Sequence, residues 1–166
     1  RNALLLSCKL LPRASQQASV TSKAGRRGTV ALATKIDNIS QLNDYLKQMA
    51  DYNSKIAYAE SAGGNASALR DRRSELLKDI SGIIDVNYIE NTNGTLYITL
   101  PSNGKSLVEG SNSWELDVQR NTSSGLYDIV FSENPSQAIN EQISGGTLAG
   151  LLEVRDVKIP SYLDQL

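Results

Sequence analysis

The clearest pattern in the first half of the chain is helical. Between Thr34 and Glu60, residues recur along one stripe at alternating spacings of three and four, which is typical of a helix that packs as in a coiled coil. The stripe consists of Ile39, Leu42, Leu46, Met49, Asn53 and Ile56. Asn53 is its one polar member, a type of position that can fix the register of packed helices. Because the stripe is short, we favour packing inside the chain's own bundle over packing against another subunit.

A second helix is expected after a turn at residues 61–67, whose composition is rich in Gly, Ser and Asn. Ser67 is expected to cap it, and Gly82 to end it in a left-handed conformation. One face carries Leu69, Leu76, Ile80 and Ile83, whereas Arg70, Arg72 and Arg73 are expected on a solvated or ion-paired face. Residues 36–82 are therefore predicted to form an antiparallel helical hairpin.

After Gly82 the period of the pattern changes from 3.6 to 2. Short alternating runs are separated by Asn- and Gly-containing turns, which is typical of antiparallel strands. The runs lie at residues 84–89, 96–100, 105–110, 114–119 and 126–131, and residues 138–142 are ambiguous. An antiparallel β domain is predicted over residues 83–143.

The first hairpin permits a choice of register. A three-residue loop pairs Asn91 with Thr95 and puts the apolar residues of both strands on one face. A two-residue loop would put Asn91 on that face instead, and a slip of one residue exchanges the buried and solvated faces. Burial therefore predicts the three-residue loop, with Asn93 and Gly94 in the turn and Gly94 left-handed.

A helical stripe returns near the end of the chain. Gly145 and Gly146 are predicted to form a hinge, and Thr147 can cap a helix that packs back on the helical part over residues 144–166. Its stripe consists of Leu148, Leu152, Arg155, Ile159, Tyr162 and Leu166. Pro160 should kink or restart this helix, and a close approach of another backbone would explain Gly150.

The predicted fold class follows from this order of elements. It is α+β: a helical bundle built on a hairpin that resembles a coiled coil, with a small antiparallel β domain inserted before the returning helix.

Charge separates the first 35 residues from the rest. Up to Ile36 there are seven Lys or Arg residues and no acid, whereas the remainder has ten basic and eighteen acidic residues. Such a segment resembles a transit peptide or an arm that binds nucleic acid or membrane. We favour a solvated or fraying end, because aromatic residues for stacking on bases are missing. The chain starts with Arg1 rather than Met, so we expect a fragment or a processed product.

Composition argues against most catalytic chemistry. The 166 residues include no histidine and a single cysteine, Cys8, which disfavours the commonest general base and the commonest zinc sites. The sequence NGKS at residues 103–106 lacks the earlier glycine of a phosphate-binding loop, because Thr99 stands there. Acidic residues are scattered, and no apolar run is long enough to span a membrane. We therefore expect no enzyme, no cofactor, no metal, no nucleic-acid partner and no membrane partner.

Two blocks of sequence resemble the flagellar hook-associated protein 1 family (FlgK). In the first, Asp71, Arg73, Leu76, Leu77, Ile80 and Ser81 match the pattern D-x-R-x-x-L-L-x-x-L-S, which leads into a strand with an Asn-Gly-Thr turn. In the second, the matching residues are Gly145, Gly146, Leu148, Gly150, Leu151, Leu152, Glu153, Arg155 and Asp156. The resemblance covers residues 36–166, is weak between Trp114 and Ile143, and fails before about Ala33.

The resemblance implies a structural subunit of the hook–filament junction, exported through the flagellar secretion channel to an extracellular site. It implies the hook protein, the second junction protein and copies of the chain itself as partners, with an export chaperone as a further candidate. Two other interpretations remain: another flagellar axial protein, such as a flagellin-like one, or a binding module that uses its β domain.

Overall fold

The computed structural model describes the backbone of residues 13–165, and the side chains from residue 34 onward apart from residue 163. Its contacts divide the chain into two units, residues 1–33 and 34–166, and the packing reported below lies within the second. The expectations for Arg1 and Cys8 fall outside the described residues. No helix in the described part is both long enough and apolar enough to cross a membrane.

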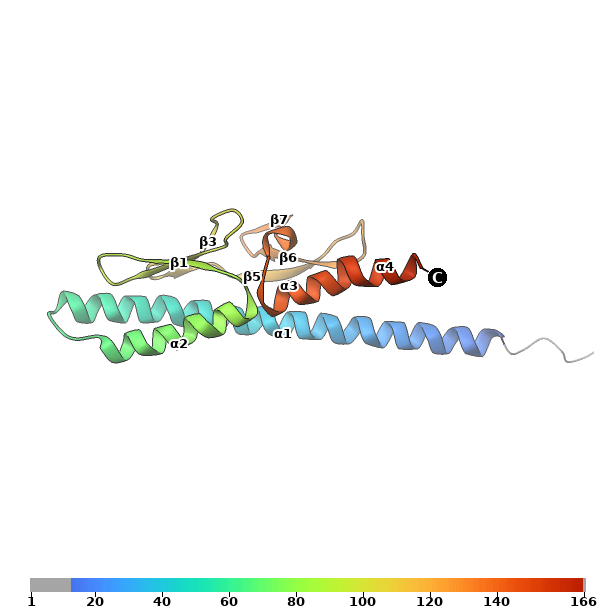
Figure 1. The fold of residues 1–166 in the computed structure, drawn as a ribbon, viewed down its shortest axis with the longest axis horizontal. Helices are drawn as coiled ribbons and strands as arrows, with labels where there is room; N and C mark the ends of the chain where they lie inside the picture. Colours follow the sequence, from blue (N-terminus) through green and yellow to red (C-terminus); the bar gives the residue numbers. More distant parts are fainter. Residues whose placement is uncertain (1–12, 166) are drawn as a thin grey trace, which may run out of the picture. The chain divides into compact units, whose positions relative to one another are not determined.

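Two helices run side by side and are joined by a short loop (Figure 1). The first, α1 (Arg13–Ser61), is continuous and starts well before the expected Thr34. The Ala, Lys and Arg residues in its basic part have good helix propensity, so their charge does not prevent a helix. The second is α2 (Ser67–Ile83).

Two predictions for the ends of α2 are wrong. Ser67 lies inside the first turn and caps nothing; its N–H instead donates to Oδ1 of Asn65 at 2.8 Å. Gly82 is not among the glycines with positive φ, and the helix continues to Ile83 before an extended Ile84 ends it. An Asn side chain can accept from a backbone N–H two residues on, which explains why Asn65 takes the role expected of Ser67.

The strands form two antiparallel sheets, and Figure 1 shows both on the same side of α1. Sheet A has the order β1 (Asn87–Glu90), β2 (Leu96–Thr99), β3 (Ser106–Glu109) and β4 (Asn112–Ser113). Sheet B has the order β5 (Leu116–Arg120), β6 (Tyr127–Phe131) and β7 (Asn134–Ala138). The ambiguous segment becomes the end of β7 and a short 3₁₀ helix, η1 (Asn140–Gln142).

The first hairpin has the register that burial predicted. Tyr88 lies opposite Ile98, and the N–H of Asn91 donates to the carbonyl of Thr95 at 2.9 Å. Gly94 has a φ of 75°, the left-handed conformation that the three-residue loop requires. Tyr88 itself is 59% exposed, however, because the helices cover β2 and leave β1 at the open edge of sheet A.

The returning helix consists of α3 (Gly146–Glu153), the π-helical segment η2 (Val154–Lys158) and α4 (Ile159–Leu163). Pro160 lies in the first turn of α4, directly after the π-helical segment, so the α-helix is interrupted and resumes near the proline, as predicted. The stripe does not continue as expected: Ile159 is 50% and Tyr162 is 67% exposed, because no described element covers them. The expectation for Leu166 lies outside the described residues.

One hydrophobic core unites α1, α2, α3 and both sheets. From the predicted packing residues it contains Ile39, Leu42, Leu46, Met49, Leu76, Ile80, Leu148 and Leu152. Ile56 is also fully buried. Leu69 is only half-buried, because it lies in the first turn of α2, near the loop end of the hairpin.

Gly145 and Gly146 lie tightly against the end of α2. A Cβ on Gly146 would come within 2.5 Å of the carbonyl group of Ile83, and φ at Gly146 is +79°. A Cβ on Gly145 would come within 2.9 Å of the Cβ of Asp85. The backbone after α2 therefore lies so close that these two positions require glycine. The role of the two glycines as a hinge stays a prediction.

The other expectations for α3 fail. Thr147 does not cap the helix, because its hydroxyl donates to the carbonyl of Gly82 at 2.9 Å and so ties α3 to α2. A Cβ on Gly150 would meet nothing within 4 Å, so no approaching backbone explains that glycine.

Candidate functional site

The most elaborate polar site in the described chain is the one that fastens sheet A to the helices. Its centre is Asn53, which is fully buried on α1 and faces β2. The Asn53 amide donates to the carbonyls of Leu96 and Gly110, both at 2.8 Å. Its oxygen accepts from the N–H of Leu96 at 2.9 Å and from Nη1 of Arg73 at 3.1 Å. Both donors and both acceptor positions of the side chain are thus used.

Asn53 completes the ladder between β2 and β3. The last pair of that ladder is Tyr97 with Glu109, so Leu96 and Gly110 would form the next rung. The Asn53 amide occupies this rung and bonds to both residues. A helix side chain therefore sets the point at which the two strands separate.

Arg73 extends the site from α2, where it is 3% exposed. Its guanidinium donates to the carbonyl of Gly94 at 2.5 Å and to the carboxylate of Glu90 at 2.8 Å. Arg73 is therefore ion-paired but not solvated. The helical pattern of α2 alone could not distinguish these two cases. Its Nε has no hydrogen-bond partner, which makes the burial of this cation more costly.

A second arginine closes the site at its outer side. Nε and Nη2 of Arg70 donate to the two oxygens of Glu60, at 2.8 and 3.0 Å, and Nη1 pairs with Glu90. The hairpin turn rests on this pair: a Cβ on Gly94 would lie 2.6 Å from the Glu60 carboxylate, and the positive φ of Gly94 favours glycine there. In the same turn, Asn93 accepts hydrogen bonds from the N–H and hydroxyl of Thr95.

These contacts shift the acidities of the carboxyl groups. The hydrogen bonds from Arg70 hold the pKa of Glu60 below its usual value. Burial alone would raise the pKa of Glu90, but hydrogen bonds from Arg73 and Arg70 outweigh it and lower the pKa. Both carboxyl groups are therefore ionised at neutral pH.

Sheet B is attached to α1 in the same way. The amide of Asn43 donates to the carbonyl of Leu116 at 2.8 Å, and its oxygen accepts from the N–H of Leu116 at 2.9 Å. Asn43 is half-buried, and Lys47, one turn later, pairs with Glu115 at 2.6 Å. Two asparagines on α1 thus each bond to both backbone groups of one strand residue, Leu96 in sheet A and Leu116 in sheet B. Together they are named the asparagine anchors below.

A third attachment joins α1, β6 and the returning helix. Nζ of Lys35 donates to the carbonyl of Tyr127 at 2.9 Å, and Nη1 of Arg155 donates to the same carbonyl. Asp128 lies 3.8 Å from Arg155, which also pairs with Asp156. Lys35 is 5% exposed. Burial and the nearby Arg155 lower its pKa to about 8.

Sequence reasoning singled out Asn53 and the hairpin turn of Asn93 and Gly94, which the structure brings together with Arg73. It missed Asn43 and the burial of Arg73. No group of three His, Cys, Asp or Glu residues within the described part of the chain could hold a metal ion. The hydrogen bonds and ion pairs of the site hold the helices and the two sheets together.

Comparison with known proteins shows which family the chain resembles. Residues 16–166 match the model described as the flagellar hook-associated protein FlgK helical domain. The match begins earlier than the expected limit near Ala33, as does α1.

Individual relatives agree. The chain is 30% identical over 128 residues to flagellar hook-associated protein 1 of Salmonella typhimurium, which covers 71% of this chain and 22% of the relative. It is 31% identical over 127 residues to that of Escherichia coli, with coverage of 75% and 20%. The chain thus spans about a fifth of the length of these relatives.

A solved structure shows the same fold. The flagellar hook junction protein FlgK from Burkholderia pseudomallei matches with a TM-score of 0.74 and 26% identity, over 86% of this chain and 26% of that one. The family match over most of the chain, the relatives and the shared fold together show that the chain belongs to the flagellar hook-associated protein FlgK family.

Proposed function

We propose that the chain is part of a structural subunit of the bacterial flagellum, assembled between hook and filament. The observation that carries the proposal is the match of residues 16–166 to the FlgK helical domain. The solved relative, named as a hook junction protein, supports the position in the flagellum. The proposed role is mechanical and not enzymatic, and it agrees with a site made of backbone anchors and ion pairs.

The partners follow from that position. We infer that the subunit is exported to the outside of the cell through the flagellar export apparatus. There it contacts the hook, the second junction protein and neighbouring copies of itself, and before export it binds a chaperone. The predicted hinge at Gly145 and Gly146 would let the sheets and the returning helix adjust to these neighbours.

Immunogold electron microscopy tests the position directly. A short epitope tag is inserted after Ser123, in the exposed loop between β5 and β6, in the full-length protein of the source bacterium. We expect label at the base of the filament in motile cells. A control tag in the exposed loop at Ser102 should give the same location.

The two other interpretations give different patterns in the same experiment. Label along the whole filament would indicate a flagellin-like protein and would contradict the proposal. Label that is absent from flagella would favour a binding module that uses the β domain.

A further inference from the structure

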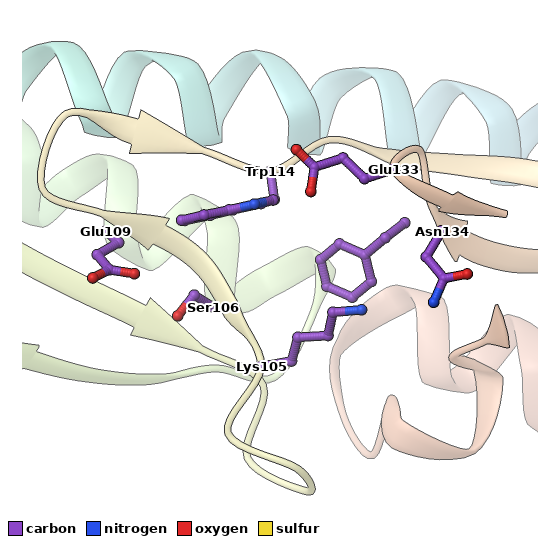
Figure 2. A pocket seen from close by; sticks show the side chains of 7 residues that line it. Lys105, Ser106, Glu109, Trp114, Glu133 and Asn134 are labelled. Carbon is purple, nitrogen blue, oxygen red and sulfur yellow. The ribbon is translucent and has the colours of Figure 1, made fainter.

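A hollow of about 260 Å³ lies where the chain passes from sheet A to sheet B. Trp114, between β4 and β5, forms one wall, and Phe131 at the end of β6 forms another. Figure 2 shows Trp114 at the hollow, with Glu109 and Glu133 on different sides of it. Trp114 is half-buried and packs against the core, so its ring is held in place.

The hollow already contains one cation on an aromatic ring. Nζ of Lys105 lies 4.0 Å from the centre of the Phe131 ring, a cation–π distance. Figure 2 shows the Lys105 side chain extending into the space between the two sheets. The chemistry of this hollow therefore accommodates an ammonium group next to an aromatic face.

The remaining groups favour a second cation. Indole is a better cation–π acceptor than a Phe ring, yet no described cation lies over Trp114. Among the described residues, neither Glu109 nor Glu133 has an ion-pair partner. With Lys105, these two carboxylates leave the hollow with one negative charge in excess.

We propose that this hollow binds an arginine side chain of a neighbouring polypeptide, stacked on Trp114, with the carboxylates of Glu109 and Glu133 on either side of the ring supplying the complementary negative charge. A guanidinium is planar, so it can stack on an indole and donate to a carboxylate beside the ring at the same time. Lysine would offer only a point charge, and a neutral sugar would leave the two carboxylates unpaired. The proposal stands on these residues and does not depend on the flagellar assignment.

The single tryptophan of the chain makes the hollow directly measurable, because intrinsic Trp fluorescence reports Trp114 alone. The probe is N-acetylarginine amide, titrated at constant ionic strength against N-acetylcitrulline amide, which has nearly the same shape without the charge. We expect a saturable change with the arginine probe, with a dissociation constant on the order of 10 mM. The citrulline probe should bind at least about fivefold more weakly.

Three variants complete the test. The double variant Glu109→Gln/Glu133→Gln should bind the arginine probe at least about fivefold more weakly. The matched control, Glu75→Gln with Asp79→Asn, removes two exposed acids on α2 and should bind as the parent does. Lys105→Met removes the competing ammonium and should tighten binding. The urea midpoint of each variant checks that it is folded.

Several results would overturn the proposal. They are the absence of a saturable arginine response, an equal response to the citrulline probe, and unchanged binding by the double Gln variant. A response to methyl glucoside without one to the arginine probe would assign the hollow to a sugar instead.

Discussion

Replacing Asn53 with alanine tests whether the asparagine anchor in sheet A is needed for stability. The change removes the partner of three backbone groups: the buried N–H and carbonyl of Leu96 and the partly buried carbonyl of Gly110. It also removes the amide oxygen that accepts a hydrogen bond from the buried Arg73. A buried polar group left unpaired costs about 1–3 kcal/mol, so the two buried groups of Leu96 alone predict a loss of at least about 2 kcal/mol.

Urea denaturation of the chain, followed by circular dichroism, measures this loss as a change in the free energy of unfolding. Asn43→Ala is the graded comparison: it removes two similar bonds at a half-buried position, so about 1 kcal/mol is expected. Gln48→Ala, at an exposed position of the same helix, should change stability by less than about 0.5 kcal/mol. A loss below about 1 kcal/mol for Asn53→Ala would show that the strands close without the anchor, and the reasoning would be refuted.

Four further predictions concern titration, glycines and assembly. The free energy of unfolding should rise between pH 8 and 10.5, because Lys35 keeps its proton in the unfolded chain over this range but has lost it in the folded chain. Urea denaturation of Lys35→Met at the same pH values should lack this rise. Stability should fall below about pH 4.5 as the lowered pKa values of Glu60 and Glu90 are passed, and a variant with Glu60→Gln and Glu90→Gln should show a smaller fall in acid titrations. In urea denaturation, Gly146→Ala should lower the free energy of unfolding by at least about 2 kcal/mol, because the new Cβ would meet backbone atoms. Gly150→Ala should raise it by up to about 1 kcal/mol. Equal effects of the two changes would contradict the role of close approach. The chain alone should sediment as a monomer, because head-to-tail assembly requires its interfaces to stay weak in solution; a closed oligomer at micromolar concentration would contradict this.

Local patterns predicted most elements of the fold, because each of these carries its own period, but they missed β7, the short β4 and the early start of α1. The spacing of Leu42, Leu46 and Met49 specifies a helix face, and alternation from Leu96 to Leu100 specifies a strand face. The register of the first hairpin followed from a comparison of two faces over a few residues. Such inferences need only neighbours in sequence.

The polar site could be predicted only in part, because its contacts join distant segments. Asn43 looks like any exposed helix residue until Leu116, 73 residues later, lies against it. Arg73 looks solvated in an isolated α2, and it is buried by Gly94 and Asn53, each more than a helix length away in the sequence. The prediction of a buried stripe after Leu152 was wrong for the opposite reason. The helical spacing of apolar residues continues there, but no described element packs against them.

The asparagine anchors have a mechanical consequence that follows from helix geometry. They are ten residues apart on one continuous helix, which corresponds to about 15 Å along its axis and to a turn of about 80° around it. The helix between them acts as a rigid spacer that fixes the offset between the two sheets. Inserting one residue there would rotate one anchor by about 100° relative to the other, so that only one sheet could remain attached. Bending of this short stretch of α1 would, by the same coupling, become a change in the angle between the sheets.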